Sequence, residues 1–374
     1  MTMRSLVLAL VLASAIVAGS RAADDPTLAA AADFTGTIMF LNSGAPGMVL
    51  AIVRGDQTLV RGYGETEPGN KHTPDGTTLL RIGSITKVFT TEVLASLAAE
   101  GKLALSDPLQ RFAAGGAKVP AFGGARPITL LDLATHSAAL PREITGDAPE
   151  GATYLTWPTR DARWKWLSGY ALPWAPGTTA VYSNIGFNLL SDAIEAAGGQ
   201  PYPDLLRSHV TGPLGMVDTV FAPTPEQCAR LMTGTGFGGP GPCVDTRTME
   251  GSGGLYGTGD DMARWLRHNL ADGGGVLALS HAVYRPRQAM PAAVGFDEAG
   301  PMAGLGLGWV TTAAQGVQPT IVQKSGGLSG FMSYVAFAPG RGVGVFVAVN
   351  RVDFAMFSAL AGAANNLIAE LATR

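Results

Sequence analysis

The stretch RIGSITKVFT, residues 81–90, places Ser84 and Lys87 three positions apart at the head of an apolar run. From Ser84 to Gly101 the chain has good helix formers and no internal proline or glycine, which predicts a helix that stops at Gly101. Apolar residues fall on nearly all sides of this helix, so we expect it to lie buried in the centre of a domain. Residues three apart share a helix face, so the Lys87 ammonium can reach the Ser84 hydroxyl.

This spacing is suited to nucleophilic catalysis. A serine hydroxyl is a poor nucleophile until a neighbouring base takes its proton, and a lysine can be that base only if its pKa falls. Burial, a helix N-terminus and a second cation all lower a lysine pKa. Taken alone, however, S-x-x-K is weak, because 18 serines and six lysines in 374 residues produce about 0.3 such pairs by chance. The alternative is a capped helix start with a solvated lysine.

A second motif lies in VYSNIGFNLL, residues 181–190, which contains the only Y-x-N of the chain. Tyr182 could carry a proton if nearby lysines stabilise its phenolate, and the Asn184 amide could hold both a lysine and a substrate carbonyl. A surface tyrosine in a turn, with the asparagine capping the next helix, is the alternative.

A third motif ends an apolar strand in TIVQKSGGLSGF, residues 320–331. Consecutive glycines, Gly326 and Gly327, let a substrate backbone approach a strand edge closely. Lys324 and Ser325 would then present a cation and a hydroxyl to a substrate carboxylate. An ordinary strand end followed by a polar turn is the alternative.

The order S-x-x-K, Y-x-N, K-[ST]-G resembles the serine penicillin-recognising enzymes, above all the class C β-lactamases and the related D,D-peptidases and esterases. YGETEPGN (63–70), LATHSAALPRE (133–143) and GSGGLYGTGDDMARW (251–265) look like the AmpH type of D-alanyl-D-alanine carboxypeptidase/endopeptidase. Ser325 stands where threonine is usual in that family, which keeps the hydroxyl.

The resemblance implies a covalent acyl-enzyme on Ser84, with Lys87 and Tyr182 moving the proton and the N–H groups of Ser84 and Gly327 forming an oxyanion hole. It assigns substrate binding to Asn184, Lys324, Ser325 and Gly326. The implied partners are peptidoglycan peptides that end in D-alanine, and β-lactams, with no cofactor. A β-lactamase, a family esterase and a non-catalytic penicillin-binding sensor remain alternatives.

The fold implied by the resemblance is α+β and β-lactamase/transpeptidase-like. Strand-like segments occur at both ends of the chain, with helical and loop segments between them, which predicts one antiparallel sheet built from both ends and a mainly helical lobe. We expect one catalytic domain over residues 23–374, with a sheet lobe at about 30–105 and 295–374 and a helical lobe at about 106–294. Gly55-Asp56 predicts the turn of an early β-hairpin, and a final amphipathic helix is predicted from about Asp353 to Ala372.

The composition argues against nucleic-acid binding, and the N-terminal segment predicts export. A net charge of -3 with 15% charged residues gives no basic footprint for nucleic acid. Residues 1–22 read as a secretory signal peptide, with Arg4 before the apolar run Leu6 to Val17, and cleavage is expected after Ala22 or, as a second choice, Ala23. A periplasmic location follows, and a peripheral association with the inner membrane is left open.

The two cysteines, Cys228 and Cys243, flank a loop rich in glycine and proline. In an exported protein such an isolated pair is most simply a disulfide, with two free thiols or a metal site as alternatives. No metal is expected, since the five histidines show no ligand spacing with each other or with the cysteines. His136, in LATHSAALP, is interpreted as structural, because nothing in the mechanism requires imidazole.

Overall fold

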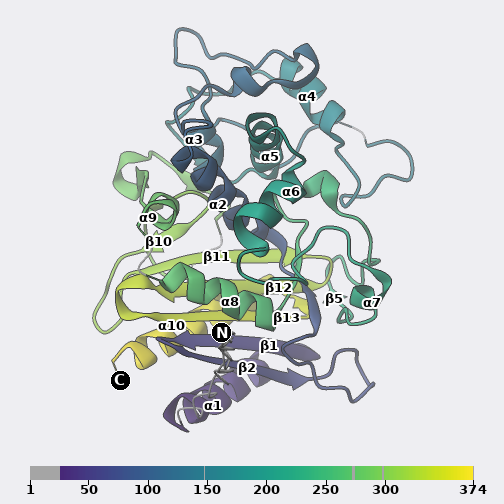
Figure 1. Ribbon diagram of the computed structural model, residues 1–374, viewed down its shortest axis with the longest axis vertical. Helices are drawn as coiled ribbons and strands as arrows, with labels where there is room; N and C mark the ends of the chain where they lie inside the picture. The colour runs from purple at the N-terminus through teal and green to yellow at the C-terminus, as the bar shows by residue number, and fades with distance from the viewer. Residues whose placement is uncertain (1–25, 147, 272–273, 297–298, 374) are drawn as a thin grey trace, which may run out of the picture.

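The computed structural model describes residues 26–146, 148–271, 274–296 and 299–373, and within them eight antiparallel strands form one sheet (Figure 1). Their order across the sheet is β2 (Gln57–Gly64), β1 (Gly47–Arg54), β13 (Val343–Val349), β12 (Phe331–Ala338), β11 (Ile321–Leu328), β10 (Val310–Thr312), β9 (Met302–Leu305) and β7 (Arg285–Pro286). Because β1 pairs with β13, the two ends of the chain build the sheet together, as predicted.

Strand β1 shows why the sheet needs cover on both sides. Val49 and Ala51 belong to one hydrophobic core, whereas Leu50 and Ile52 belong to the other. Side chains alternate between the faces of a strand, so a continuous apolar strand is buried on both. The predicted hairpin is confirmed: Arg54 pairs with Gln57 across the Gly55 turn.

Helices lie on both faces of the sheet and fill a second lobe. Helices α1 and α10 cover one face, while α8 and the helical lobe cover the other (Figure 1). The helices are α1 (Pro26–Ser43), α2 (Thr86–Ala99), α3 (Leu130–Ala134), α4 (Arg160–Gly169), α5 (Asn184–Gly198), α6 (Tyr202–Leu206), α7 (Pro225–Cys228), α8 (Gly259–Leu270), α9 (Val276–His281) and α10 (Phe354–Ala372). The expected α+β fold is confirmed.

Helix α2 runs through the centre of the protein, as its apolar sequence predicted. Every residue from Thr86 to Leu97 is buried. The α-helix proper begins at Thr86, and Ser84 lies just before it in a 3-10 turn. The helix ends where expected, with Gly101 in the left-handed region at φ +72°.

The structure adds detail for three elements that the sequence did not place. Helix α1 was not predicted, because its buried positions are largely small residues such as Ala31, Ala32 and Gly36, which give a weak apolar pattern. Helix α8 and strand β7 fall within the range expected for the helical lobe. The structure instead packs α8 against β1 and β13 and adds β7 to the edge of the sheet, since a sheet face must be covered by an apolar layer.

Helix α10 is the helix among the described residues that is long and apolar enough to cross a membrane. Its side chains Phe357, Leu360 and Ile368 pack into the core on one face of the sheet. The predicted signal peptide, residues 1–22, lies outside the described residues.

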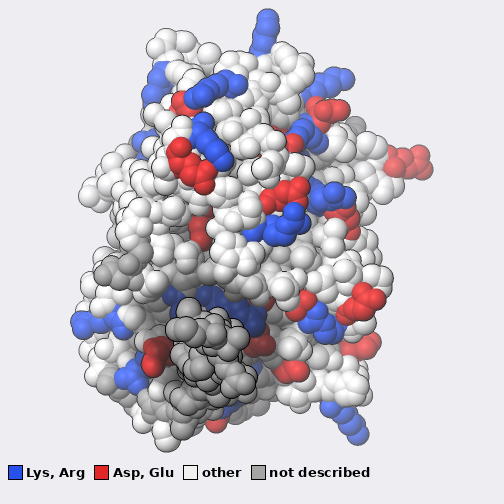
Figure 2. All heavy atoms as spheres, viewed as in Figure 1, with Lys and Arg blue, Asp and Glu red and all other residues white. Residues whose placement is uncertain are grey.

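On the face drawn in Figure 2, basic and acidic side chains are scattered among uncharged atoms.

The predicted disulfide is present, with Cys228 and Cys243 joined across 15 positions. The enclosed loop carries the short strand β5 (Thr235–Gly236), which pairs with β14 (Arg351–Val352) at the end of the sheet. Buried Arg81 donates hydrogen bonds to the carbonyls of Gly241 and Pro242 in the same loop. The loop is therefore fixed to neighbouring segments at several points.

Replacing both cysteines by serine is expected to lower the free energy of unfolding by about 3 kcal/mol, because the cross-link no longer restricts the unfolded chain. Urea denaturation followed by circular dichroism measures this loss. The wild type in reducing agent should lose a similar amount. Equal stability of the oxidised wild type and the double variant would contradict the prediction.

Candidate active site

The three sequence motifs meet in one groove of about 630 Å³. Ser84 enters it from the turn before α2, and Lys87 lies beneath it in the first turn of that helix. The remaining motif residues come from the start of α5 and from strand β11. Those that line the groove are Tyr182, Asn184, Ser325, Gly326 and Gly327. Segments far apart in the sequence are thus brought together as predicted.

Lys87 is at the centre of this arrangement and is fully buried. Its Nζ lies 3.1 Å from Ser84 Oγ, 2.7 Å from Asn184 Oδ1 and 2.5 Å from the carbonyl oxygen of Ser252. The lysine is therefore held within hydrogen-bond reach of the serine hydroxyl, the geometry that a nucleophile and its base require.

The surroundings of Lys87 make its charged form unfavourable. Burial lowers its pKa well below the usual value, and the cation of Lys324 lowers it further. Glu143 acts in the opposite direction, and Arg142 adds a smaller lowering effect. A lysine whose pKa is depressed in this way can accept a proton near neutral pH.

Tyr182 lies between the cations of the site and is buried. Lys87 Nζ is 4.8 Å, Lys324 Nζ 5.1 Å and the Arg142 guanidinium carbon 4.8 Å from the centre of its ring. These three side chains surround the phenol ring. The aromatic ring also receives cation–π contacts from all three.

His136 contacts both Tyr182 and Ser183 of the Y-x-N motif. Its ring stacks on Tyr182 with centroids 4.5 Å apart, and its Nδ1 accepts a hydrogen bond from the Ser183 N–H at 3.0 Å. Burial lowers the pKa of this imidazole well below its usual value, with further lowering by Lys87 and Lys324. The neutral imidazole therefore holds the Tyr182 ring in position by stacking on it.

The turn that carries the nucleophile touches strand β11 directly, and two glycines allow this contact. Gly83 has φ +52°, and a Cβ there would lie 2.6 Å from the Gly327 nitrogen. A Cβ on Gly326 would lie 2.1 Å from the carbonyl oxygen of Ile82. Both distances are too short for a side chain. Ser84 and Gly327 consequently line the same groove.

The groove extends past Gly327 along an aromatic wall that the sequence did not identify. Phe237 and Phe354 line it with 78% and 68% of their surface exposed, one from the disulfide loop and one from the start of α10. Tyr154 also lines it and bonds to Ser329 Oγ. Arg142 and Glu143 line it too. Apart from Phe354, which begins α10, these residues stand in loops. No periodic pattern assigned any of them to the groove, although Arg142 and Glu143 end the family-like stretch 133–143.

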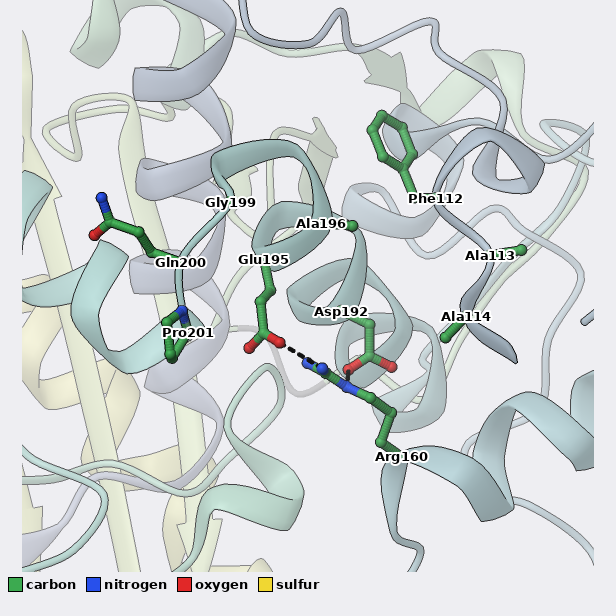
Figure 3. A pocket seen from close by; sticks show the side chains of 10 residues that line it. All are labelled: Phe112, Ala113, Ala114, Arg160, Asp192, Glu195, Ala196, Gly199, Gln200 and Pro201. Atoms are coloured by element: carbon green, nitrogen blue, oxygen red, sulfur yellow. Dashed lines mark hydrogen bonds and ion pairs between the residues drawn. The ribbon is translucent and has the colours of Figure 1, made fainter. Parts of the chain in front are cut away.

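A second cavity of about 390 Å³ lies beside an ion-pair cluster and shares no lining residue with the groove (Figure 3). Arg160 Nε donates to Asp192 at 2.8 Å, and its Nη1 donates to Glu195. Arg163 Nε donates to the same Asp192 at 2.7 Å, and burial raises the pKa of Glu250 to about 8. The arginine and carboxylate groups pair with one another, so we interpret the cluster as stabilising the fold. Within the described residues, no three histidine, cysteine or acidic side chains are grouped to hold a metal ion.

Comparison with known proteins decides the family. The family model described as Beta-lactamase matches residues 25–370. The chain belongs to the β-lactamase family. Members of this family that resemble the chain include the D-alanyl-D-alanine-carboxypeptidase/endopeptidase AmpH of Escherichia coli strain K12, which is 42% identical over 343 residues, covering 89% of this chain and 86% of that protein. The "Beta-lactamase" of Pseudomonas fluorescens is 24% identical over 82% of this chain and 88% of its own length.

A solved structure within the family shows the same architecture. The crystal structure titled Beta-lactamase/D-alanine Carboxypeptidase from Yersinia pestis, complexed with citrate, superposes with a TM-score of 0.87 at 41% sequence identity. The match covers 92% of this chain and 98% of the Yersinia chain. The resemblance to AmpH-type enzymes inferred from the sequence is thereby confirmed.

Proposed function

We propose that this protein is a serine D,D-peptidase that cleaves peptidoglycan peptides at D-alanine and forms an acyl-enzyme on Ser84. The observation that carries the proposal is the contact of a fully buried lysine, Lys87, with the Ser84 hydroxyl in the same groove as the K-S-G strand. The 42% identity to a D-alanyl-D-alanine-carboxypeptidase/endopeptidase supports this substrate class. Penicillin would bind the same groove, because a β-lactam imitates the scissile bond.

The chemistry follows from the placement of these groups. Ser84 Oγ attacks the carbonyl carbon of the scissile amide while its proton passes to Lys87. Tyr182 then donates its proton to the leaving amine and takes up the proton held by Lys87, so that both groups return to their starting state. The oxyanion that forms accepts hydrogen bonds from the N–H groups of Ser84 and Gly327, and one such donor is worth about 3 kcal/mol in related acyl transfer. Water then releases the acyl group by the reverse proton path.

Substrate orientation is assigned to the remaining motif residues. Lys324 and Ser325 hold the terminal carboxylate, and Gly326 allows the peptide to approach strand β11. Asn184 holds Lys87 through its Oδ1, at 2.7 Å, and orients the acyl part of the substrate. Residues 1–22 would direct the protein to the periplasm. Association with the inner-membrane surface remains a prediction that no contact of the structure supports.

β-Lactamase activity is the second candidate function, because the Yersinia structure carries both activities in its title. Purified protein should be given a D-Ala-D-Ala pentapeptide, nitrocefin and a p-nitrophenyl ester, and the three values of kcat/KM compared. A peptidase should have its highest kcat/KM with the pentapeptide. Its acyl-enzyme formed with nitrocefin should be hydrolysed slowly. Rapid nitrocefin turnover without peptide hydrolysis would overturn the peptidase proposal, and turnover of the ester alone would indicate an esterase. A non-catalytic sensor would turn over none of the three.

Replacing the two charged residues at the edge of the groove, Arg142 and Glu143, should shift the pH dependence of acylation in opposite directions. The Arg142 cation lowers the Lys87 pKa, so Arg142→Met should raise that pKa and move the rising limb of the rate to higher pH. Glu143 raises the Lys87 pKa, so Glu143→Gln should move the limb to lower pH. Each shift is expected to be below about one pH unit, because both groups face solvent. The second-order rate of labelling by fluorescent penicillin, measured from pH 5 to 10, checks both signs; shifts of the same sign would contradict the assignment.

A further inference from the structure

Arg81 is a buried cation at the end of strand β3 (Leu79–Arg81), three positions before the nucleophile, and only 1% of its surface is exposed. Its guanidinium carbon lies 4.9 Å from the centre of the Tyr256 ring. Burial lowers the pKa of Arg81 from its usual value, because the charge has lost its contact with water. Within the described ranges its Nε and Nη1 have no hydrogen-bond partner. Departures of this kind from the rules of stability are expected mainly at functional sites.

The remaining nitrogen of the guanidinium binds the second half of the disulfide loop, residues 237–242, which we call loop segment 237–242. Arg81 Nη2 donates to the carbonyl of Gly241 at 3.0 Å and to that of Pro242 at 2.6 Å. The next residue, Cys243, is cross-linked to the start of the loop. Two independent attachments, the guanidinium and the disulfide, therefore hold the same end of this segment.

Loop segment 237–242 also packs against the active site. Its first two residues line the groove. A Cβ on Gly241 would lie 2.8 Å from Ser329 Oγ, and a Cβ on Gly239 would lie 2.8 Å from the Cα of Gly330. Both distances are shorter than side chains tolerate, so the segment lies directly on the turn that joins β11 and β12. That turn follows the K-S-G motif within two residues. The position of the segment is thus linked to the position of the strand end that the substrate approaches.

We propose that Arg81 is a positioning residue for the acylation of Ser84, because it holds loop segment 237–242 against the β11–β12 turn together with the Cys228–Cys243 disulfide. Arg81 itself lies outside the groove and acts through the loop. The two attachments hold one segment, so loss of either should release it, and loss of both should add little. Displacements of about 1 Å at groups that position a substrate can slow a reaction by up to about 10²-fold. The inference rests on the proposed acyl-enzyme on Ser84.

A double-mutant cycle tests whether the two attachments act as a unit. Arg81→Met and the double variant Cys228→Ser/Cys243→Ser should each slow labelling by fluorescent penicillin by about 10-fold, an intermediate value for a misplaced group. The combined variant should also be slowed by about 10-fold, whereas independent effects would multiply to about 100-fold. Arg81→Lys should regain most of the rate, because an ammonium can donate to the same carbonyls. A wild-type rate in folded Arg81→Met, or a combined loss equal to the product, would overturn the proposal.

A second variant reaches the same contact without changing Arg81. The methyl group of Gly241→Ala would press on Ser329, so this variant should also slow labelling. Gly124→Ala is its matched control, since a Cβ on Gly124 meets no atom within 4 Å. Urea denaturation shows which variants are folded. If Arg81→Met does not fold, Gly241→Ala decides: slowed labelling relative to Gly124→Ala supports the proposal, and an equal rate removes it.

Amide hydrogen exchange separates failure of this proposal from failure of the proposed function. Peptides that cover residues 237–244 should exchange faster in Arg81→Met and in the cysteine variant than in the wild type. Arg247→Met is the charge-matched control, because Arg247 is exposed and pairs with Asp245, and its exchange in this region should equal that of the wild type.

The two measurements give different answers when different claims fail. If the wild type is labelled and Arg81→Met is labelled equally fast, the acyl-enzyme remains and the positioning role of Arg81 is removed. If the wild type is not labelled at all, the acyl-enzyme proposal fails. Exchange then decides whether Arg81 holds loop segment 237–242: faster exchange in Arg81→Met supports this contact, and unchanged exchange removes it.

Discussion

Replacing Lys87 by alanine is expected to slow acylation of Ser84 by about 10²- to 10⁴-fold, the usual contribution of a general base. The side chain lies 3.1 Å from Ser84 Oγ, and burial with the Lys324 cation depresses its pKa. The second-order rate constant for labelling by fluorescent penicillin measures the loss.

The control for this variant is Lys102→Ala. Lys102 is a half-exposed lysine that pairs with Glu100 just after the same helix, so its removal changes the net charge equally without touching the groove. It should acylate at the wild-type rate. Urea denaturation checks that Lys87→Ala is folded, which is needed because the substitution also removes the hydrogen bonds of Lys87 to Asn184 and to the Ser252 carbonyl. Acylation of folded Lys87→Ala within 10-fold of the wild type would exclude the lysine as the base.

Replacing Tyr182 by phenylalanine is expected to reduce peptide hydrolysis by about 10²-fold or more, since the proton carrier to the leaving amine is lost. The ring itself is retained, so its stacking on His136 and the cation–π contacts of Lys87 should persist. The loss therefore reports the hydroxyl rather than packing. Steady-state hydrolysis of a D-Ala-D-Ala pentapeptide gives the number.

Tyr170→Phe serves as its control, because Tyr170 packs on Trp166 in the helical lobe and lines neither cavity. That variant should retain wild-type kcat/KM. A Tyr182→Phe enzyme that hydrolyses the pentapeptide as fast as the Tyr170→Phe enzyme would assign the proton transfer to another group.

The motif residues could be found from the sequence because each carries a local signal. Ser84 and Lys87 share a helix face by spacing, and the glycines after Ser325 mark a strand open to a substrate. All three motifs contribute residues to one groove. Patterns that are weak indications of an active site when taken singly are therefore a strong indication when they occur together in this order. The roles assigned to them remain predictions for the experiments above.

Residues of the groove rim could not be found in this way. Phe237, Arg142 and Glu143 lie in loops, and their place depends on where distant elements dock. Loop positions carry function without periodicity. Asn188 looked like one polar residue in an amphipathic helix, and only the structure shows that it faces the groove without a partner.

The fold was predictable where alternation or length gave a pattern. Strands β1, β11, β12 and β13 read clearly because long apolar runs are typical of strands buried on both faces. Helix α1 did not, because most of its buried positions are small residues. Helix α8 falls within the range expected for the helical lobe and contacts strands of the sheet, since sequence order alone does not say which elements a helix packs against.

The identity of the nucleophile is the central claim, and the mass of a penicillin adduct tests it most directly. After incubation with penicillin and digestion, the wild type should carry the mass of one opened penicillin on the peptide that contains Ser84. Ser84→Ala should carry none at any site, with its fold unchanged. A stable adduct of equal yield in Ser84→Ala, or an adduct in the wild type on a peptide that lacks Ser84, would contradict the account.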